Sequence, residues 1–245
     1  MKEPTDIGLN RTGMSASPWL SGRMTDDTWM AMPAVPGNET DLGRIRIEYA
    51  RVAGPLGSVP PPANLKGVAT TFLQMGQGRK PTAFLDKLAE RMAFERTGTR
   101  LYEILIGKFQ ASDSPTGPVT LDGLKTFHDQ ELAHFGMLCD CLEKLGADPT
   151  VETPCADLVG VECLGLVQAM ADPRTTFAQT LHGMLIAELA DNDGWRMLID
   201  LAEGMKQHEM AETFRQAWKE EDVHLDYARS WMASLEKEEA HVPNR

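Results

Sequence analysis

Residues 121–145 read LDGLKTFHDQELAHFGMLCDCLEKL. Apolar side chains in this stretch fall on one face of an α-helix, which repeats about every 3.6 residues: Leu124, Phe127, Leu138, Leu142 and Leu145. Between Phe127 and Leu138, the same face carries Glu131 and, one turn later, His134. The stretch therefore predicts a long helix that directs a carboxylate and an imidazole toward the protein interior.

The same combination occurs in a second helix, predicted over residues 208–236. Glu221 interrupts its apolar face between Ala217 and Ala228, and His224 follows one turn later. Because residues three apart share a helix face, each Glu-x-x-His pair can present an oxygen and a nitrogen to one metal ion.

Two more helices, predicted over residues 82–109 and 174–203, each place a single glutamate in the apolar stripe, at Glu95 and Glu188. The position in the stripe carries this argument, because a further Glu-x-x-His pair begins at Glu238 in the charged tail, away from any apolar face. Four helices therefore each aim one carboxylate at a common interior.

The predicted fold is all-α, a four-helix bundle in which short loops join the first helix to the second and the third to the fourth. One long crossover, at about residues 147–173, joins the two pairs and holds a short helix after Pro154. Gly146 is expected just past the end of the second helix. Asp172 and Pro173 are expected to cap and begin the third.

The chain divides into three parts by composition. Residues 1–80 hold eight of the fifteen prolines and scattered aromatic residues, which predicts an extended, mostly irregular N-terminal arm. Residues 81–236 form the bundle, and residues 237–245 a charged tail. We expect the arm to pack on its own bundle or on a partner subunit, which favours a homo-oligomer, a dimer or larger.

Four carboxylates inside one bundle would repel one another, and burying each without a partner costs several kcal/mol. The predicted interior stripes contain no lysine or arginine, so bound cations are expected to supply the positive charge. Two divalent ions would neutralise four carboxylates. Mixed oxygen and nitrogen ligands suit iron or manganese, with zinc and cobalt left open.

The composition of the chain also limits its expected partners and location. The net charge is −12, which argues against partners such as nucleic acids or anionic membranes. The sequence shows no apolar run of about 20 residues and no apolar secretory signal, so we expect no membrane span. None of the four cysteines forms a C-x-x-C pair, which predicts reduced thiols and a cytoplasmic protein.

Over about residues 82–236, the order E…E-x-x-H…E…E-x-x-H resembles the ferritin-like dimetal-carboxylate superfamily. That superfamily includes bacterioferritins, rubrerythrins, manganese catalases and the radical-generating ribonucleotide reductase subunit. Within this range, LIAELADNDGWRMLIDLA, residues 185–202, is similar to uncharacterised bacterial ferritin-like domain proteins.

The resemblance implies a ligand set of four glutamates and two histidines: Glu95, Glu131, His134, Glu188, Glu221 and His224. The glutamates of the two E-x-x-H motifs would bridge two ions, iron above all, with manganese or zinc as alternatives. The other two glutamates would be terminal ligands, and each histidine would bind one ion.

The implied function is that of an oxidoreductase reacting with dioxygen or peroxide, as a ferroxidase or peroxidase does. Two alternatives stay open, a metal-binding or iron-storage protein without organic turnover and a protein similar to manganese catalase.

Three neighbouring residues are further candidates. Tyr102, two turns after Glu95, could supply an electron or hydrogen-bond a ligand, or could simply be a core tyrosine. Asp191 could accept the second N–H of a metal-bound histidine, or could lie on the polar surface. His128 could support the site, although a partly exposed histidine fits its position better.

Overall fold

The structure is a computed structural model that describes residues 39–60, 80–112, 117–150 and 152–241. These residues contain six α-helices and no strand, which confirms the all-α class. The chain separates into two compact units, residues 1–55 and residues 56–245.

The first unit contains helix α2, Glu39–Val52. The arm was predicted to be extended and mostly irregular, and its described part includes this helix of 14 residues, so the prediction for the whole arm stays a prediction. Its large apolar side chains Leu42, Ile45, Ile47 and Tyr49 are exposed within the chain. The arm's two tryptophans, Trp19 and Trp29, lie outside the described residues.

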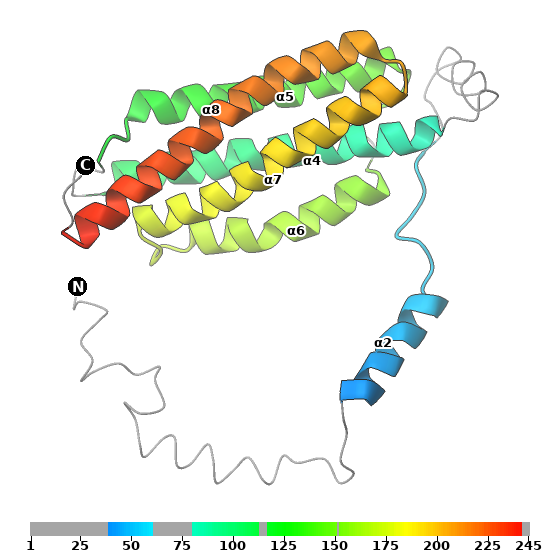
Figure 1. The fold of residues 1–245 in the computed structure, drawn as a ribbon, viewed down its shortest axis with the longest axis horizontal. Helices are drawn as coiled ribbons and strands as arrows, with labels where there is room; N and C mark the ends of the chain where they lie inside the picture. Colours follow the sequence, from blue (N-terminus) through cyan, green and yellow to red (C-terminus); the bar gives the residue numbers. More distant parts are fainter. Residues whose placement is uncertain (1–38, 61–79, 113–116, 151, 242–245) are drawn as a thin grey trace. The chain divides into compact units, whose positions relative to one another are not determined.

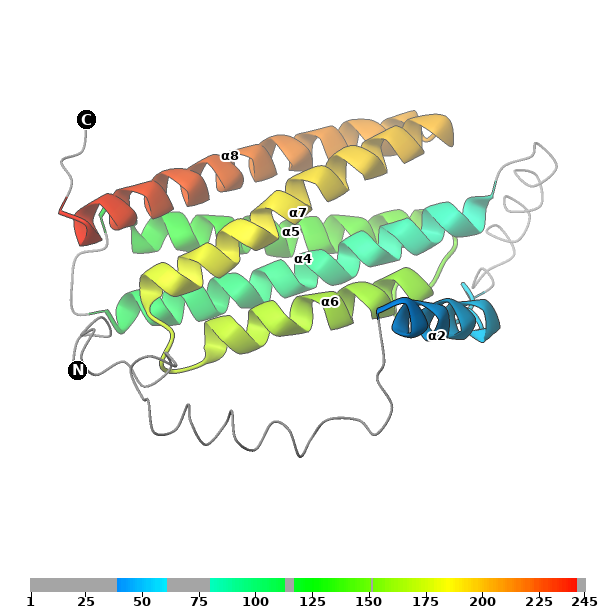
Figure 2. The same ribbon diagram turned by 60° about the horizontal axis from the view of Figure 1, so that its bottom comes forward.

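The second unit is built from five helices: α4 Pro81–Gln110, α5 Leu121–Lys144, α6 Pro154–Ala171, α7 Phe177–Gly204 and α8 His208–Glu239. Four of them, α4, α5, α7 and α8, lie side by side along the long axis of the unit (Figures 1 and 2). Consecutive helices α4 and α5 run antiparallel, as do α7 and α8 (Figure 1). The predicted bounds of these four helices agree with the structure to within about three residues.

The connection between α5 and α7 differs from the prediction. A short helix was expected there, but α6 has 18 residues and runs along the outside of α4 and α7 (Figure 2). Pro154 occupies its first turn, and the side chain of Thr153 caps it by accepting a hydrogen bond from the Ala156 N–H.

The extra helix explains why α4 is buried on two faces. The predicted stripe of α4 is buried at Leu88 and Tyr102, but Phe94 and Leu105 on another face are buried as well. A helix that contacts α5, α6 and α7 together cannot keep a single apolar face. Phe109, at the end of the predicted stripe, is only partly buried.

The helix ends show one confirmed prediction and one error. Gly146 has a φ of 82° after α5, and the N–H groups of Gly146 and Ala147 bond back to Glu143 and Leu142 as in a Schellman motif. The start of α7, by contrast, is capped by Thr176, not by Asp172.

Thr176 and Gln179 form a reciprocal capping box at the start of α7. Asp172, the expected cap, lies in the preceding turn, where its carboxylate accepts hydrogen bonds from Arg174. The prediction was wrong because both Asp172-Pro173 and Thr176 are typical residues for a helix start. The capping box of Thr176 and Gln179 gives hydrogen-bond partners to two backbone N–H groups, those of Thr176 and Gln179.

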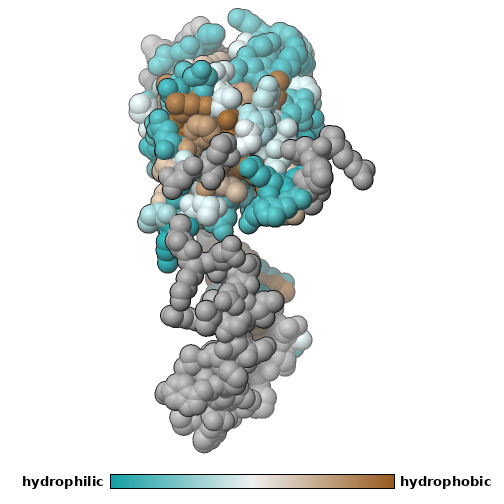
Figure 3. All heavy atoms as spheres, turned by 90° about the vertical axis from the view of Figure 1, so that its left-hand side faces the viewer, coloured by the Kyte–Doolittle hydropathy of each residue, from teal (hydrophilic) through white to brown (hydrophobic). Residues whose placement is uncertain are grey.

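Two hydrophobic clusters make up the core of the second unit. One surrounds Tyr102, Phe127 and Leu181, and the other surrounds Leu88, Trp195 and Phe214. The space-filling view of one end of the unit shows a mostly hydrophilic surface with a hydrophobic area among the helix ends (Figure 3).

By length and composition, α6 is the one described helix that is apolar enough to cross a membrane. Leu158, Val161 and Leu164 are exposed on it, while its other face packs on α4. Core helices of water-soluble proteins meet the same criterion, so the expected absence of a membrane span stays a prediction. All four cysteines are free thiols, as expected.

We expect Thr176→Ala to lower the free energy of unfolding by about 1 kcal/mol, because it removes the oxygen that accepts the Gln179 N–H at the start of α7. Urea unfolding followed by circular dichroism measures this. Thr213→Ala is the matched control, since its exposed hydroxyl bonds only the carbonyl of Glu209 within α8. A loss as large in the control would contradict the capping role.

Candidate metal centre

The six residues predicted as metal ligands come together between α4, α5, α7 and α8. None of them is more than 5% exposed. Their oxygen and nitrogen atoms converge in two groups, and within each group the ligand atoms lie within 4.8 Å of one another. The sequence pattern therefore located one buried cluster correctly.

We call the two groups position A and position B. Position A consists of Glu95, His134 and Glu221, and position B of Glu131, Glu188, Glu221 and His224. Glu221 belongs to both, as a bridging carboxylate would. Glu131, the other glutamate that the resemblance implies as bridging, belongs to position B alone.

Each histidine turns the same ring nitrogen toward the carboxylates. His134 Nδ1 lies 2.6 Å from Glu221 Oε1 and 3.5 Å from Glu95 Oε2. His224 Nδ1 lies 2.9 Å from Glu221 Oε2 and 3.4 Å from Glu131 Oε1. The Nδ1 atoms are thus the nitrogens that could bind metal.

The outer nitrogens of the histidines bind partners that the sequence analysis missed. His134 Nε2 lies 3.1 Å from Glu220 Oε2, and His224 Nε2 lies 2.9 Å from Gln130 Oε1. Each partner directly precedes the motif glutamate of the opposite helix, so the two contacts are reciprocal. Such outer contacts fix the ring orientation of a metal-binding histidine.

Asp191 was the predicted partner of a histidine, and the structure places it elsewhere in the cluster. It is 2% exposed, and its Oδ1 lies 2.8 Å from Arg91 Nη2. Arg91 Nη1 also donates to the Asp191 carbonyl oxygen over 3.1 Å, and Arg91 Nε lies 3.2 Å from Glu95 Oε1.

Arg91 corrects the expectation that the interior holds no basic side chain. It is 6% exposed and lies one turn before Glu95 on α4, although it was not among the residues of the predicted stripe. Its guanidinium also lies 4.2 Å from the centre of the Phe94 ring. Gly194 leaves it room, because a Cβ there would lie 1.9 Å from Arg91 Nη1.

Tyr102 belongs to the site through a hydrogen bond. Its buried hydroxyl donates to Glu188 Oε1 over 2.5 Å, and its ring packs edge-on against His224. The bond leaves Glu188 Oε2 free to face the cluster. A role in electron transfer stays a prediction.

His128 lies apart from the two groups. Its ring nitrogens lie 2.9 Å from an Asp129 oxygen and 3.7 Å from a Glu103 oxygen, and its side chain is 21% exposed. The position matches the partly exposed histidine that the sequence favoured.

The net charge of the cluster indicates whether its residues are compatible with bound metal ions. Five buried carboxylates face one guanidinium, which leaves four negative charges uncompensated when both histidines are neutral. Two divalent cations carry that charge. Both carboxylate oxygens of Glu95 and of Glu221, and the Nδ1 atoms of His134 and His224, are buried without hydrogen-bond partners, which fits a set of metal ligands.

Titration behaviour reflects the same crowding. Burial, reinforced by the neighbouring carboxylates, raises the pKa values of Glu131 and Glu188 well above the usual range. Burial disfavours charge on His134, but the carboxylates of Glu221 and Glu95 beside its Nδ1 outweigh this and raise its pKa to about 10. Burial also acts against ionised Glu221, yet the closely placed His134 and His224 rings lower its pKa. In the metal-free protein, bound protons therefore reduce the negative charge of the cluster.

Gly98 makes room for one of the ligands. A Cβ at this position would lie 2.1 Å from Glu131 Oε2, too close for the carboxylate to keep its place. Gly98 was not among the predicted site residues, although a glycine in the middle of a strong helical pattern was a signal for it.

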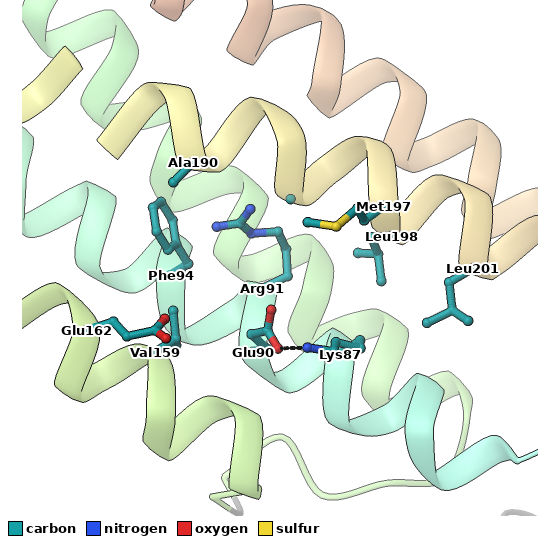
Figure 4. A pocket seen from close by; sticks show the side chains of 11 residues that line it. Lys87, Glu90, Arg91, Phe94, Val159, Glu162, Ala190, Met197, Leu198 and Leu201 are labelled. Carbon is teal, nitrogen blue, oxygen red and sulfur yellow. Dashed lines mark hydrogen bonds and ion pairs between the residues drawn. The ribbon is translucent and has the colours of Figure 1, made fainter. Parts of the chain in front are cut away.

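Two hollows adjoin the centre. A pocket of about 380 Å³ lies between α4, α6 and α7 (Figure 4). Apolar side chains line it together with Lys87, Glu90, Glu162 and Arg91, whose guanidinium points toward α7. A groove between α5 and α8 is lined by Gln130 and Glu220, the outer partners of the histidines. The arginine and histidine sides of the cluster thus face different hollows.

Comparison of the chain with protein-family models, with curated proteins and with solved structures gives no match. The assignment of this centre therefore rests on its own geometry and charge.

The pKa of His134 implies a pH dependence of stability. A histidine whose pKa rises from 6.5 to about 10 on folding stabilises the protein fully below pH 6.5, and this contribution is lost as the pH rises through 10. The raised pKa values of Glu131 and Glu188 also make the free energy of unfolding fall as the pH rises above the ordinary pKa of a glutamate. We expect the melting temperature of the metal-free protein to fall between pH 6.5 and 10, measured by calorimetry with chelator present.

His134→Gln is the comparison for this experiment and should fall less steeply over the same range. A melting temperature that stays level or rises between pH 6.5 and 10 in the metal-free wild type would contradict the protonated cluster.

Gly98→Ala should destabilise the protein, although alanine favours helices over glycine by about 1 kcal/mol. The added Cβ would displace the Glu131 carboxylate. Gly107→Ala on the same helix has nothing within 4 Å of its Cβ and should raise stability. Urea unfolding of both variants measures the contrast, and equal changes in both would show that Gly98 is not a packing constraint.

Proposed function

We propose that this chain is a ferritin-like dimetal-carboxylate protein, a four-helix bundle that binds two divalent metal ions, iron in preference, and acts as an oxidoreductase on dioxygen or peroxide. The observation that carries the proposal is a buried cluster in which five carboxylates, when ionised beside neutral histidines, exceed the one guanidinium by four negative charges. Hydrophobic packing cannot compensate such charge, and Arg91 balances a single carboxylate.

The ligand chemistry favours iron among divalent ions. Carboxylate oxygens and imidazole nitrogens form a set of intermediate softness that suits iron and manganese. When bound, a pair of such ions supplies two electrons to an oxidant. Calcium and magnesium are less suited, since they prefer oxygen ligands alone.

The residues of the chain divide the remaining tasks. Glu221 holds the two positions together, because it is the one carboxylate shared by both. Gln130 and Glu220 orient the histidines through their outer nitrogens. Tyr102 orients Glu188 and places an oxidisable ring at position B, which favours redox chemistry over metal binding alone.

Two further expectations belong to this proposal. The chain forms a homo-oligomer through its N-terminal arm, and it works in the cytoplasm. Light scattering coupled to chromatography tests the first, and a monomer would remove it.

The proposal is tested by metal analysis of tag-free protein, by mass spectrometry after anaerobic loading with ferrous ion. We expect about two ions per chain in the wild type, and loss of most of them in Glu131→Gln/Glu221→Gln, because both positions lose a ligand. Circular dichroism confirms that the variant is folded.

The chain provides a matched control. Glu238 and His241 form a third Glu-x-x-His pair, exposed at the end of α8, so Glu238→Gln/His241→Gln should keep both ions. Oxygen uptake by the ferrous protein then separates an oxidoreductase from a protein that only stores metal. Wild-type protein that binds no metal would reject the proposal.

A further inference from the structure

The two halves of the centre differ in their charged surroundings. Position B has three carboxylates, those of Glu131, Glu188 and Glu221. The hydrogen bond from Tyr102 holds one oxygen of Glu188 and directs the other inward without bringing a positive charge.

Position A has two carboxylates, Glu95 and Glu221, and it shares Glu221 with position B. The remaining one, Glu95, already faces a permanent cation, since Arg91 Nε lies 3.2 Å from its Oε1. A metal ion at position A would therefore compete with the guanidinium for Glu95 Oε1.

Arg91 cannot move away from Glu95 easily. Its two terminal nitrogens bind the carboxylate and the carbonyl oxygen of Asp191, and its plane lies over Phe94. Gly194 on α7 provides the space that the guanidinium fills. An arginine also keeps its charge at any accessible pH.

We infer that the two metal positions are unequal, and that Arg91 is the positioning residue that makes position A the weaker and more exchangeable one. Position B fills first. This inference rests on the proposed function, because it concerns the order in which the same centre takes up its ions.

The experiment is an anaerobic titration of the metal-free full chain with Co²⁺, followed by calorimetry and by visible absorption. We expect two binding steps whose dissociation constants differ about tenfold or more, since unbalanced charge in a buried site changes affinity strongly. A chelator should remove one of the two ions first.

Single-ligand variants assign the steps. Glu188→Gln should weaken the tight step, and Glu95→Gln should remove the weak one, because each glutamate belongs to one position only. This part of the test does not depend on changing Arg91, so it holds even where an Arg91 variant fails to fold.

The role of Arg91 is tested with Arg91→Met/Asp191→Asn, which removes one charge of each sign and leaves the net charge of the cluster unchanged. The weak step should tighten several-fold and the tight step should stay the same. The control is Arg229→Met/Asp226→Asn, which removes an exposed ion pair on α8 and should leave both steps as in the wild type.

Each outcome decides the matter. Three results would overturn the inference while leaving a dimetal centre in place. They are binding of two ions in a single step, loss of the tight step in Glu95→Gln, and an unchanged ratio of the two dissociation constants in Arg91→Met/Asp191→Asn. Failure of the wild type to bind any Co²⁺ or Fe²⁺ would instead reject the proposed function, and the inference with it.

Discussion

The structure depends on how the mutual repulsion among five buried carboxylates is balanced. One of them comes from each of α4, α5 and α8, and two come from α7. A buried negative charge is tolerated only with a partner, and the chain supplies one permanent cation for the five. The rest of the bundle is arranged around this group of carboxylates, which has less positive than negative charge. Two hydrophobic clusters close the helices on either side of it, and Gly98 and Gly194 clear the space that Glu131 and Arg91 occupy.

The hydrogen bonds around the centre cross from one half of the chain to the other. Gln130 on α5 binds His224 on α8, and Glu220 on α8 binds His134 on α5. These two helices otherwise pack sparsely, with a groove between them. The contacts that orient the Nδ1 atoms of the two histidines therefore also span this groove, so the geometry of the buried cluster and the spacing of α5 and α8 are coupled.

The sequence was sufficient to predict the four long helices and the buried cluster, because a glutamate that replaces an apolar residue at helical spacing must point inward with the stripe. It was insufficient for Arg91, because a long charged side chain one turn from Glu95 can extend to solvent, and only the fold brings Asp191 of α7 within 2.8 Å of its guanidinium. The partners Gln130 and Glu220 were missed for a similar reason. They lie one residue outside the stripe, where a helix pattern alone predicts a solvated side chain, and only the opposite helix makes them neighbours of a histidine.

The nature of the internal cation constrains what the centre can do. A lysine at position 91 could release its proton when the charge nearby increases, whereas the guanidinium of Arg91 keeps its charge. With Asp191 paired to Arg91, the four glutamates would balance the two divalent ions of the proposed centre and would hold no reserve of negative charge. A reaction that raises the charge of the bound ions would have to bring its own negative charge into the site. An oxidant that becomes anionic as it accepts electrons meets this condition, and the protein side chains do not.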